Sequence, residues 1–177
     1  LITAEDVLEA QPDVVSHING GPTSIPHEAV RELCGHATGA LEAVHNGNEK
    51  SAIVAMEAAL EAGRLADFLL GTDAPAGSGV QPNGMLRMVT LLASFGGLPA
   101  EQAICCATGN ITRKRKIDQG MLEAGRPADI VFLDRPDGSA GKNVLEAMAM
   151  GNIPGIAAVM IDGKMRTGRS RSTPPSA

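Results

Sequence analysis

The sequence has no tryptophan and no tyrosine, and it has only three phenylalanines among 177 residues. We therefore expect a core of alanine, leucine, isoleucine, valine and methionine, which suits close packing of helices on strands. Long hydrophobic runs are also missing, so we expect no membrane-spanning helix and no contact with a membrane. No basic and then apolar leader opens the chain, so we expect no signal peptide either.

Cysteine and positive charge are scarce as well. Cys34, Cys105 and Cys106 have neither a disulfide framework nor zinc-ligand spacing. We interpret all three as small buried residues in a reducing compartment, and we expect a cytoplasmic protein. The net charge of -5 argues against nucleic acid as a partner. The one basic run, residues 113–116, is interpreted as a solvated loop or helix face.

What the sequence does contain is an alternation of strand and helix patterns over its first hundred residues. Short apolar runs predict strands over residues 14–18, 39–45 and 65–70. Apolar spacings of three and four predict helices over residues 3–10, 26–35, 48–62 and 82–95, and a further helix from residue 99. This βαβ alternation predicts a parallel sheet, in either a doubly wound fold or part of a (β/α)8 barrel.

The pattern changes after Asn110. Residues 120–129 are rich in turn formers, and strands are predicted over residues 130–133 and 156–161 with a short helix over 142–150 between them. Asp162-Gly163 predicts a two-residue hairpin turn into a last strand over residues 164–166. We expect residues 1–112 to form the α/β part, 113–167 to add strands of a second unit, and 168–177 to be an extended or disordered tail.

Two of the predicted strands are followed by side chains that can bind metal or move a proton. His17 lies at the end of the first apolar run, and Asp73 lies just past the third. Active sites of α/β folds collect at such carboxyl ends, and a His and an Asp there suit a metal-dependent hydrolase. The alternatives are a histidine buried in the core and an aspartate that merely caps a turn.

Residues 14–22, 69–79, 107–110 and 120–129 together resemble the amidohydrolase superfamily of metal-dependent hydrolases, and most closely its enamidase-like branch, which opens the ring of a cyclic enamide. The resemblance implies an α/β fold: the carboxyl-terminal part of a (β/α)8 TIM barrel, about strands six to eight, plus strands of a flanking β-sandwich. A barrel takes roughly 250 residues, and the family's His-x-His pair has no counterpart here. We therefore expect this chain to be the carboxyl-terminal part of a longer enzyme.

The resemblance also implies roles for single residues. His17 matches a metal ligand. Asp73 matches a ligand that is also catalytic, because it takes the proton from the attacking water. The candidates for contact with substrate are Asn19, Gly20, Gly21 and His45, of which the first three could equally make a turn. The implied cofactors are one or two divalent metal ions, zinc and/or iron, with manganese and nickel as further options.

The implied reaction is hydrolysis of a C–N bond in a small cyclic amide by a metal-activated water. Since the chain holds only part of that site, we expect it to be inactive alone, and we expect the complete enzyme to be a homo-oligomer. One alternative is a non-enzymatic binding or assembly module. Another is a small doubly wound domain whose loop at Gly20 and Gly21 cradles a phosphate, but this loop has no dinucleotide or P-loop pattern, and Pro22 withholds a backbone donor.

Overall fold

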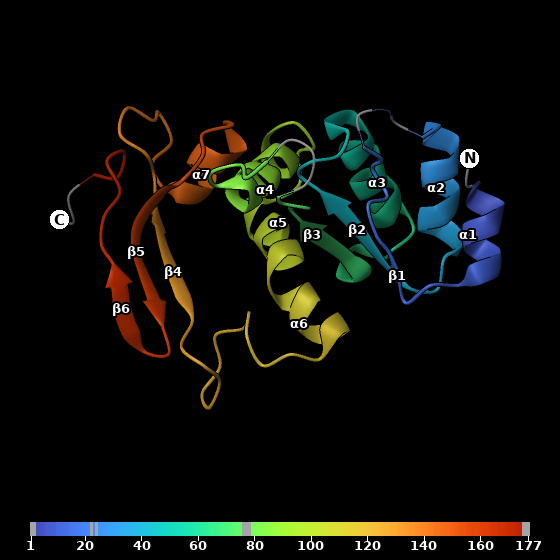
Figure 1. Ribbon diagram of the computed structural model, residues 1–177. Helices are drawn as coiled ribbons and strands as arrows, with labels where there is room; N and C mark the ends of the chain where they lie inside the picture. Colours follow the sequence, from blue (N-terminus) through green and yellow to red (C-terminus); the bar gives the residue numbers. More distant parts are fainter. Residues whose placement is uncertain (1–2, 22, 24, 76–78, 175–177) are drawn as a thin grey trace.

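The computed structural model describes residues 3–21, 23, 25–75 and 79–174, and within them two small sheets organise the chain (Figure 1). In chain order the elements are α1 (Ala4–Ala10), β1 (Val14–Val15), α2 (His27–His36), β2 (Ala40–Val44), α3 (Glu49–Glu61), the 3₁₀ turn η1 (Leu65–Asp67), β3 (Phe68–Gly71), α4 (Gly84–Ser94), α5 (Ala100–Ala107), α6 (Gly109–Arg115), β4 (Ile130–Asp134), α7 (Val144–Ala149), β5 (Gly155–Ile161) and β6 (Lys164–Thr167). None of these helices combines the length and apolar composition that a bilayer crossing requires. The mixed α/β fold is as expected.

The first sheet is parallel and has the order β1-β2-β3, with α2 and α3 as the crossover helices. Two predicted strands are shorter than expected. The first ends after Val15, because the chain turns at His17, whose carbonyl accepts a hydrogen bond from the amide of Gly20. The third begins only at Phe68, because residues 65–67 form a 3₁₀ turn instead of strand. Both ends therefore carry local turns that an apolar run does not reveal.

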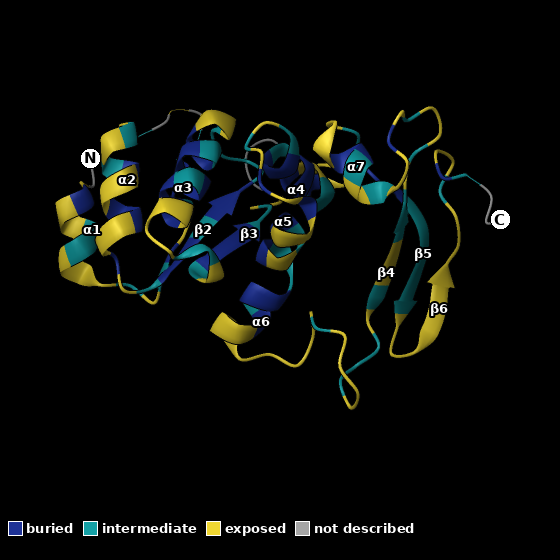
Figure 2. Cartoon of the chain, turned by 180° about the vertical axis from the view of Figure 1, so that it is seen from behind, coloured by how far each residue is buried: buried dark blue, intermediate teal, exposed yellow. Residues whose placement is uncertain are grey.

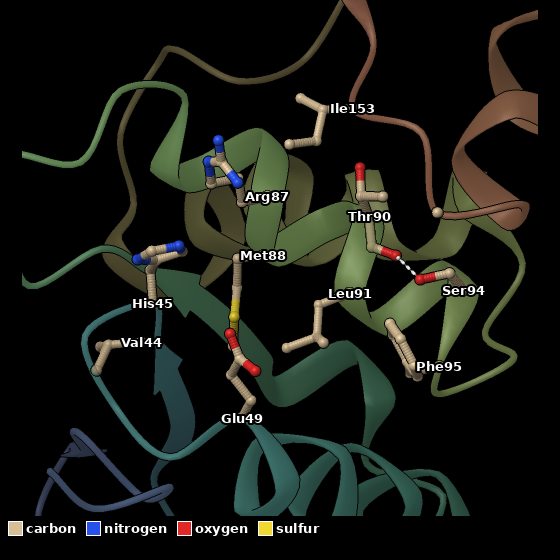
Figure 3. A pocket seen from close by; sticks show the side chains of 11 residues that line it. Val44, His45, Glu49, Arg87, Met88, Thr90, Leu91, Ser94, Phe95 and Ile153 are labelled. Atoms are coloured by element: carbon tan, nitrogen blue, oxygen red, sulfur yellow. Dashed lines mark hydrogen bonds between the residues drawn. The ribbon is translucent and has the colours of Figure 1, made fainter. Parts of the chain in front are cut away.

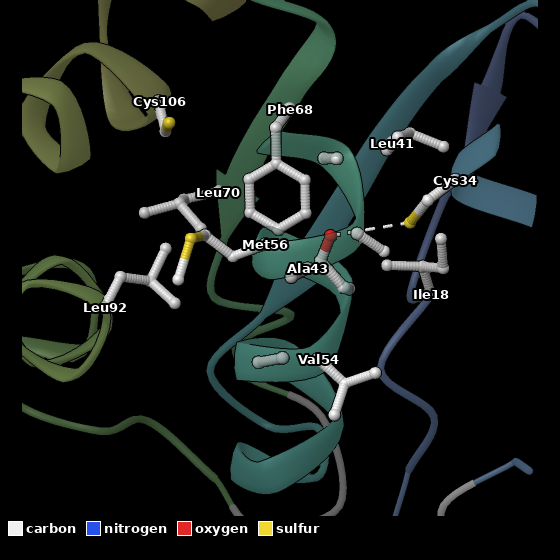
Figure 4. Close-up of a cluster of buried hydrophobic side chains, with 14 of the residues drawn as sticks. Ile18, Cys34, Leu41, Ala43, Val54, Met56, Phe68, Leu70, Leu92 and Cys106 are labelled. Carbon is white, nitrogen blue, oxygen red and sulfur yellow. Dashed lines mark hydrogen bonds between the residues drawn. The ribbon is translucent and has the colours of Figure 1, made fainter. Parts of the chain in front are cut away.

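The core lies between this sheet and its helices and is built around one aromatic ring, that of Phe68 (Figure 4). Phe68 and Leu70 of β3 pack with Met56 of α3 and Leu92 of α4, and all four are at most 1% exposed. Truncating a ring in such a position costs about 3–5 kcal/mol. Leu69 points to the opposite face and is also fully buried, so β3 is covered on both sides, as buried parallel strands require.

All three cysteines were predicted to be buried, but one of them is exposed. Cys34 and Cys106 are buried in the core, but Cys105 is exposed on α5. Neighbouring residues on a helix point about 100° apart, so Cys105 and Cys106 cannot both face the core. Burial raises the pKa of Cys34 to about 11 and that of Cys106 to about 12, which keeps both as neutral thiols.

Helix α6 has no counterpart among the predicted elements, and it is fixed by the amide of Asn110. That amide donates to the carbonyl oxygens of Leu65 and Phe68 at 2.8 and 3.0 Å, while its oxygen accepts from Arg113 at 2.5 Å. Asn110 is 3% exposed. The Asn110 side chain thus gives the carbonyl groups at the start of β3 the hydrogen-bond donor that a backbone amide would otherwise supply. These bonds anchor α6 to the sheet.

The four basic residues at the end of α6 are exposed, as expected, and two of them also form ion pairs with acidic residues. Lys114 forms an ion pair with Asp67, and Arg115 lies 3.6 Å from the carboxylate of Glu42 on β2. Asp67 also accepts a hydrogen bond from Arg64, whose other N–H groups bind two backbone carbonyls. A helix face was one of the two forms expected for this run, but its charges serve to hold α6 against the strands.

The second sheet is antiparallel, in the order β4-β5-β6, with the predicted hairpin turn at Asp162-Gly163. Helix α7 packs on α4 and α5, and β6 is the most exposed strand (Figure 2). The start of the tail is ordered: the Ser170 amide and the Thr173 hydroxyl both donate to the carbonyl of Ile156, and Thr173 is 3% exposed. Residues 175–177 lie outside the described ranges.

The ion-pair cluster at Asp67 predicts a pH-dependent contribution to stability. Burial raises the pKa of the Asp67 carboxyl, but hydrogen bonds from Lys114 and Arg64 outweigh burial and hold the pKa below its usual value. A carboxyl of this kind stabilises the fold above its unfolded pKa, and the effect is lost as the pH falls through the folded pKa. We expect Asp67→Asn to lower the free energy of unfolding by about 1–2 kcal/mol at pH 7.

Urea unfolding of both proteins at pH 7 and at about pH 3 checks this expectation. The difference between Asp67→Asn and the parent should shrink at the lower pH, because the carboxylate of the unfolded parent takes up a proton there before the folded one does, and the charged folded form loses its advantage. The same substitution at the exposed Asp118 is the control and should change little at either pH. An equal loss of stability at both pH values would contradict the assignment.

Candidate active site

The structure brings His17 and Asp73 together, although they lie 56 positions apart in the sequence. His17 follows β1 and Asp73 follows β3, and the distance between His17 Nε2 and Asp73 Oδ2 is 3.1 Å. The side chains are 33% and 42% exposed, so His17 is not a core histidine. Both residues have left-handed backbone conformations, with φ of 59° and 53°. Strained residues of this kind persist where the surrounding structure holds them in place, and they cluster at functional sites.

The pair fits part of a metal shell but does not complete one. Two donors about 2.1 Å from the same ion lie roughly 3.0–3.4 Å apart for angles between 90° and 109°, and the observed 3.1 Å falls in that range. A catalytic zinc takes three protein ligands. Within the described ranges no group of three or more His, Cys, Asp or Glu side chains could hold a metal. His17 and Asp73 can therefore supply two ligands and need others from elsewhere.

Glu42 of β2 lies between the two strand ends, and sequence reasoning missed it. Its carboxylate accepts a hydrogen bond from the hydroxyl of Ser16, and its backbone carbonyl accepts from the amide of Ile18 at 2.9 Å. The residues on both sides of His17 are thus bound to Glu42. One signal was available: Glu42 is the single charged residue in the apolar run of its strand. Its geometry makes it the group that orients the turn carrying His17.

Asn46, just beyond β2, holds the other half of the pair. Its side-chain amide donates to the carbonyl oxygen of Asp73 at 2.8 Å, and its backbone amide donates to the carbonyl of Thr72 at 3.2 Å. The backbone pairing of β2 with β3 therefore continues past the strands as far as the candidate catalytic residue. The end of the middle strand therefore supports both candidate ligands.

Asn19 has a structural position. It is fully buried, and its amide exchanges two hydrogen bonds of 2.9 Å with the backbone of Val44 and donates a third, of 3.3 Å, to the carbonyl of Asn48. The sequence left two roles open for Asn19, contact with a substrate or a role in the turn. The structure shows the turn, because the hydrogen-bonding groups of the Asn19 side chain are bound to the backbone. Gly20 has a φ of 66°, which favours glycine, whereas a Cβ on Gly21 would meet open space.

His45 ends β2, and its backbone amide donates to Gly71 of β3 at 3.0 Å. Its ring does not join the His17 and Asp73 pair in any hydrogen bond. The ring instead lines a cavity between α3 and α4, whose lining includes neither of those two residues. The sequence-based expectation that His45 faces the substrate thus remains a prediction. In the structure His45 lines this cavity instead of joining the pair.

Comparison with known proteins shows the family of this chain. Residues 24–166 match the amidohydrolase family. The chain belongs to the amidohydrolase family. It is 42% identical over 175 residues to the enamidase of Eubacterium barkeri, covering 99% of this chain and 45% of that enzyme. The sequence-based resemblance to the enamidase-like branch is thereby confirmed.

Solved structures give the same picture. The crystal structure of an enamidase, described as a new member of the amidohydrolase superfamily, superimposes with a TM-score of 0.92 at 42% identity and covers 99% of this chain and 46% of that one. A β-aspartyl dipeptidase from Fervidobacterium islandicum shares the fold alone, with a TM-score of 0.57 at 17% identity over 92% of this chain and 42% of its own. This amidohydrolase-family chain spans less than half the length of these relatives.

The buried amide of Asn19 gives a prediction that separates a structural role from a role in binding. Asn19→Ala leaves backbone groups of Val44 without partners, and we expect it to lower the free energy of unfolding by about 2–4 kcal/mol. Gly21→Ala adds a methyl group in open space at an ordinary φ and should change stability by less than about 0.5 kcal/mol. Chemical denaturation of both variants is the measurement. If Asn19→Ala were as stable as Gly21→Ala, the buried hydrogen bonds would not be what holds this loop.

Proposed function

We propose that this chain is the carboxyl-terminal part of a metal-dependent amidohydrolase that cleaves a C–N bond in a small cyclic amide. The observation that carries the proposal is the pair His17 and Asp73, whose donor atoms lie 3.1 Å apart at one edge of a parallel sheet. Family membership and 42% identity to an enamidase support the reaction class. The expected cofactor is one or two divalent ions, with zinc and/or iron first, because imidazole and carboxylate suit both.

We further propose that β1, β2 and β3 are strands six to eight of a (β/α)8 barrel and that β4, β5 and β6 belong to a flanking sandwich. Three parallel strands joined by helices, with the polar residues at the carboxyl edge, are what such a piece would contain. The relatives are more than twice as long as this chain. The missing metal ligands would then come from residues outside this chain.

The bound metal would lower the pKa of a water molecule to about 7 and polarise the amide carbonyl. Asp73 accepts the proton of the attacking water on its carboxylate and passes it to the leaving nitrogen. His17 presents Nε2 beside Oδ2 of Asp73, and Glu42 fixes the turn that carries His17 through Ser16 and Ile18. The partial exposure of both side chains leaves room for a substrate above them.

Two substitutions in the complete enzyme test these roles. Asp73→Asn keeps the size of the side chain but cannot accept a proton, so we expect a loss of at least about 100-fold in kcat with the fold intact. His17→Ala removes a ligand and should lower the metal content as well as the rate. Steady-state kinetics on a cyclic amide and metal analysis of the purified proteins are the measurements.

The matched control is His36→Ala, which removes an exposed histidine at the end of α2. It should leave both the rate and the metal content unchanged. Turnover at the parent rate by metal-loaded Asp73→Asn would refute the catalytic assignment. Unchanged metal occupancy in His17→Ala would show that His17 is not a ligand.

The alternative function, a non-enzymatic binding or assembly module, applies to the chain on its own, because the described residues supply two metal ligands instead of three. We expect the 177-residue chain alone to retain less than one equivalent of zinc after dialysis and to hydrolyse no cyclic amide. Metal analysis after dialysis and an amide hydrolysis assay check both points. Stoichiometric zinc together with turnover would show that this chain holds a complete site.

A further inference from the structure

The cavity that His45 lines lies between the start of α3 and the length of α4, and it has a volume of about 160 Å³ (Figure 3). Its lining includes His45, Glu49, Arg87, Thr90, Leu91 and Phe95. Phe95, which is 79% exposed, is part of this lining. An engineered cavity of about 150 Å³ holds benzene, so the available space suits a ligand of roughly six to eight heavy atoms.

Two of the residues that line the cavity each carry a buried polar atom without a partner. Among the described residues, three buried side-chain atoms have no hydrogen-bond partner, and two of them, His45 Nδ1 and Thr90 Oγ1, belong to residues that line this cavity. Thr90 is only 4% exposed. The nearby hydroxyl of Ser94 donates to the backbone carbonyl of Thr90 at 2.7 Å and so does not satisfy its side chain. Buried polar atoms normally have partners, but these two atoms are closed off from the open space of the cavity.

Two oppositely charged side chains also line the cavity, and they form no ion pair with each other. The guanidinium of Arg87 makes one bond, from Nε to the carbonyl of Pro82 at 3.3 Å, and no ion pair within the described ranges. The carboxylate of Glu49 likewise has no ion pair there. Figure 3 shows the two side chains on either side of Met88, which together with Leu91 gives the lining an apolar surface. A cation, an anion and an apolar floor are complementary to a zwitterion.

We propose that this cavity binds a small amino carboxylate, a molecule with one carboxylate and one ammonium group on a short apolar chain. The carboxylate pairs with Arg87 and the ammonium with Glu49. The chain lies over Met88 and Leu91. The proposal does not depend on hydrolysis, because neither His17 nor Asp73 lines this cavity.

Three probes of similar size test it by calorimetric titration of the protein. 4-Aminobutyrate carries both charges, butyrate carries only the anion, and butylamine carries only the cation. We expect 4-aminobutyrate to bind with a dissociation constant of about 1 mM and to bind at least about fivefold more tightly than either single-charge probe. Equal affinity for 4-aminobutyrate and butyrate would overturn the proposal, as would no binding of 4-aminobutyrate up to about 50 mM.

Two variants then test which side chain binds which charged group of the ligand. Arg87→Met should weaken 4-aminobutyrate about fivefold while leaving butylamine unchanged, and Glu49→Gln should do the same while leaving butyrate unchanged. Helix α3 should persist in Glu49→Gln, because its cap is the Asn48 side chain, which accepts from the Ser51 amide at 3.0 Å. Arg126→Met, at an arginine paired with Glu123 outside the cavity, is the control. A loss of affinity in Arg126→Met equal to that in Arg87→Met would overturn the site.

Discussion

The double pairing of β2 is the interaction on which the candidate active site depends. β2 bonds in parallel to β1 on one side and to β3 on the other, and both ladders continue beyond the strands. The amide of Ile18 reaches the carbonyl of Glu42, and the amide of Asn46 reaches that of Thr72. Because parallel strands end at a common edge, this continuation carries His17 and Asp73 to within hydrogen-bond distance.

That placement has a cost in backbone conformation, which neighbouring side chains offset. Left-handed backbone at a residue other than glycine costs of order 1 kcal/mol or more, and it occurs at both His17 and Asp73. Around His17, the Ser16 hydroxyl binds Glu42 and the buried amide of Asn19 fixes the following loop. Around Asp73, the amide of Asn46 holds the backbone carbonyl. The polar residues of β2 and its flanks thus support a geometry that the strands alone would not give.

The sequence predicted what depends on periodicity and missed what depends on single side chains. The long helices, the parallel strands and the positions of His17 and Asp73 at strand ends follow from repeated apolar spacing, and the structure agrees with them. The turn at His17, the helix anchored by Asn110 and the orienting role of Glu42 rest on contacts with residues far away in the sequence. Local patterns carry no information on such partners, and the exposed Cys105 shows the same limit.

The central claim is that His17 and Asp73 bind one metal ion together, and anomalous diffraction from crystals of the zinc-loaded complete enzyme tests it most directly. Data collected above and below the zinc absorption edge should place an anomalous peak within about 2.3 Å of both His17 Nε2 and Asp73 Oδ2. A peak at another position, with the two side chains still bonded directly to each other, would contradict the account.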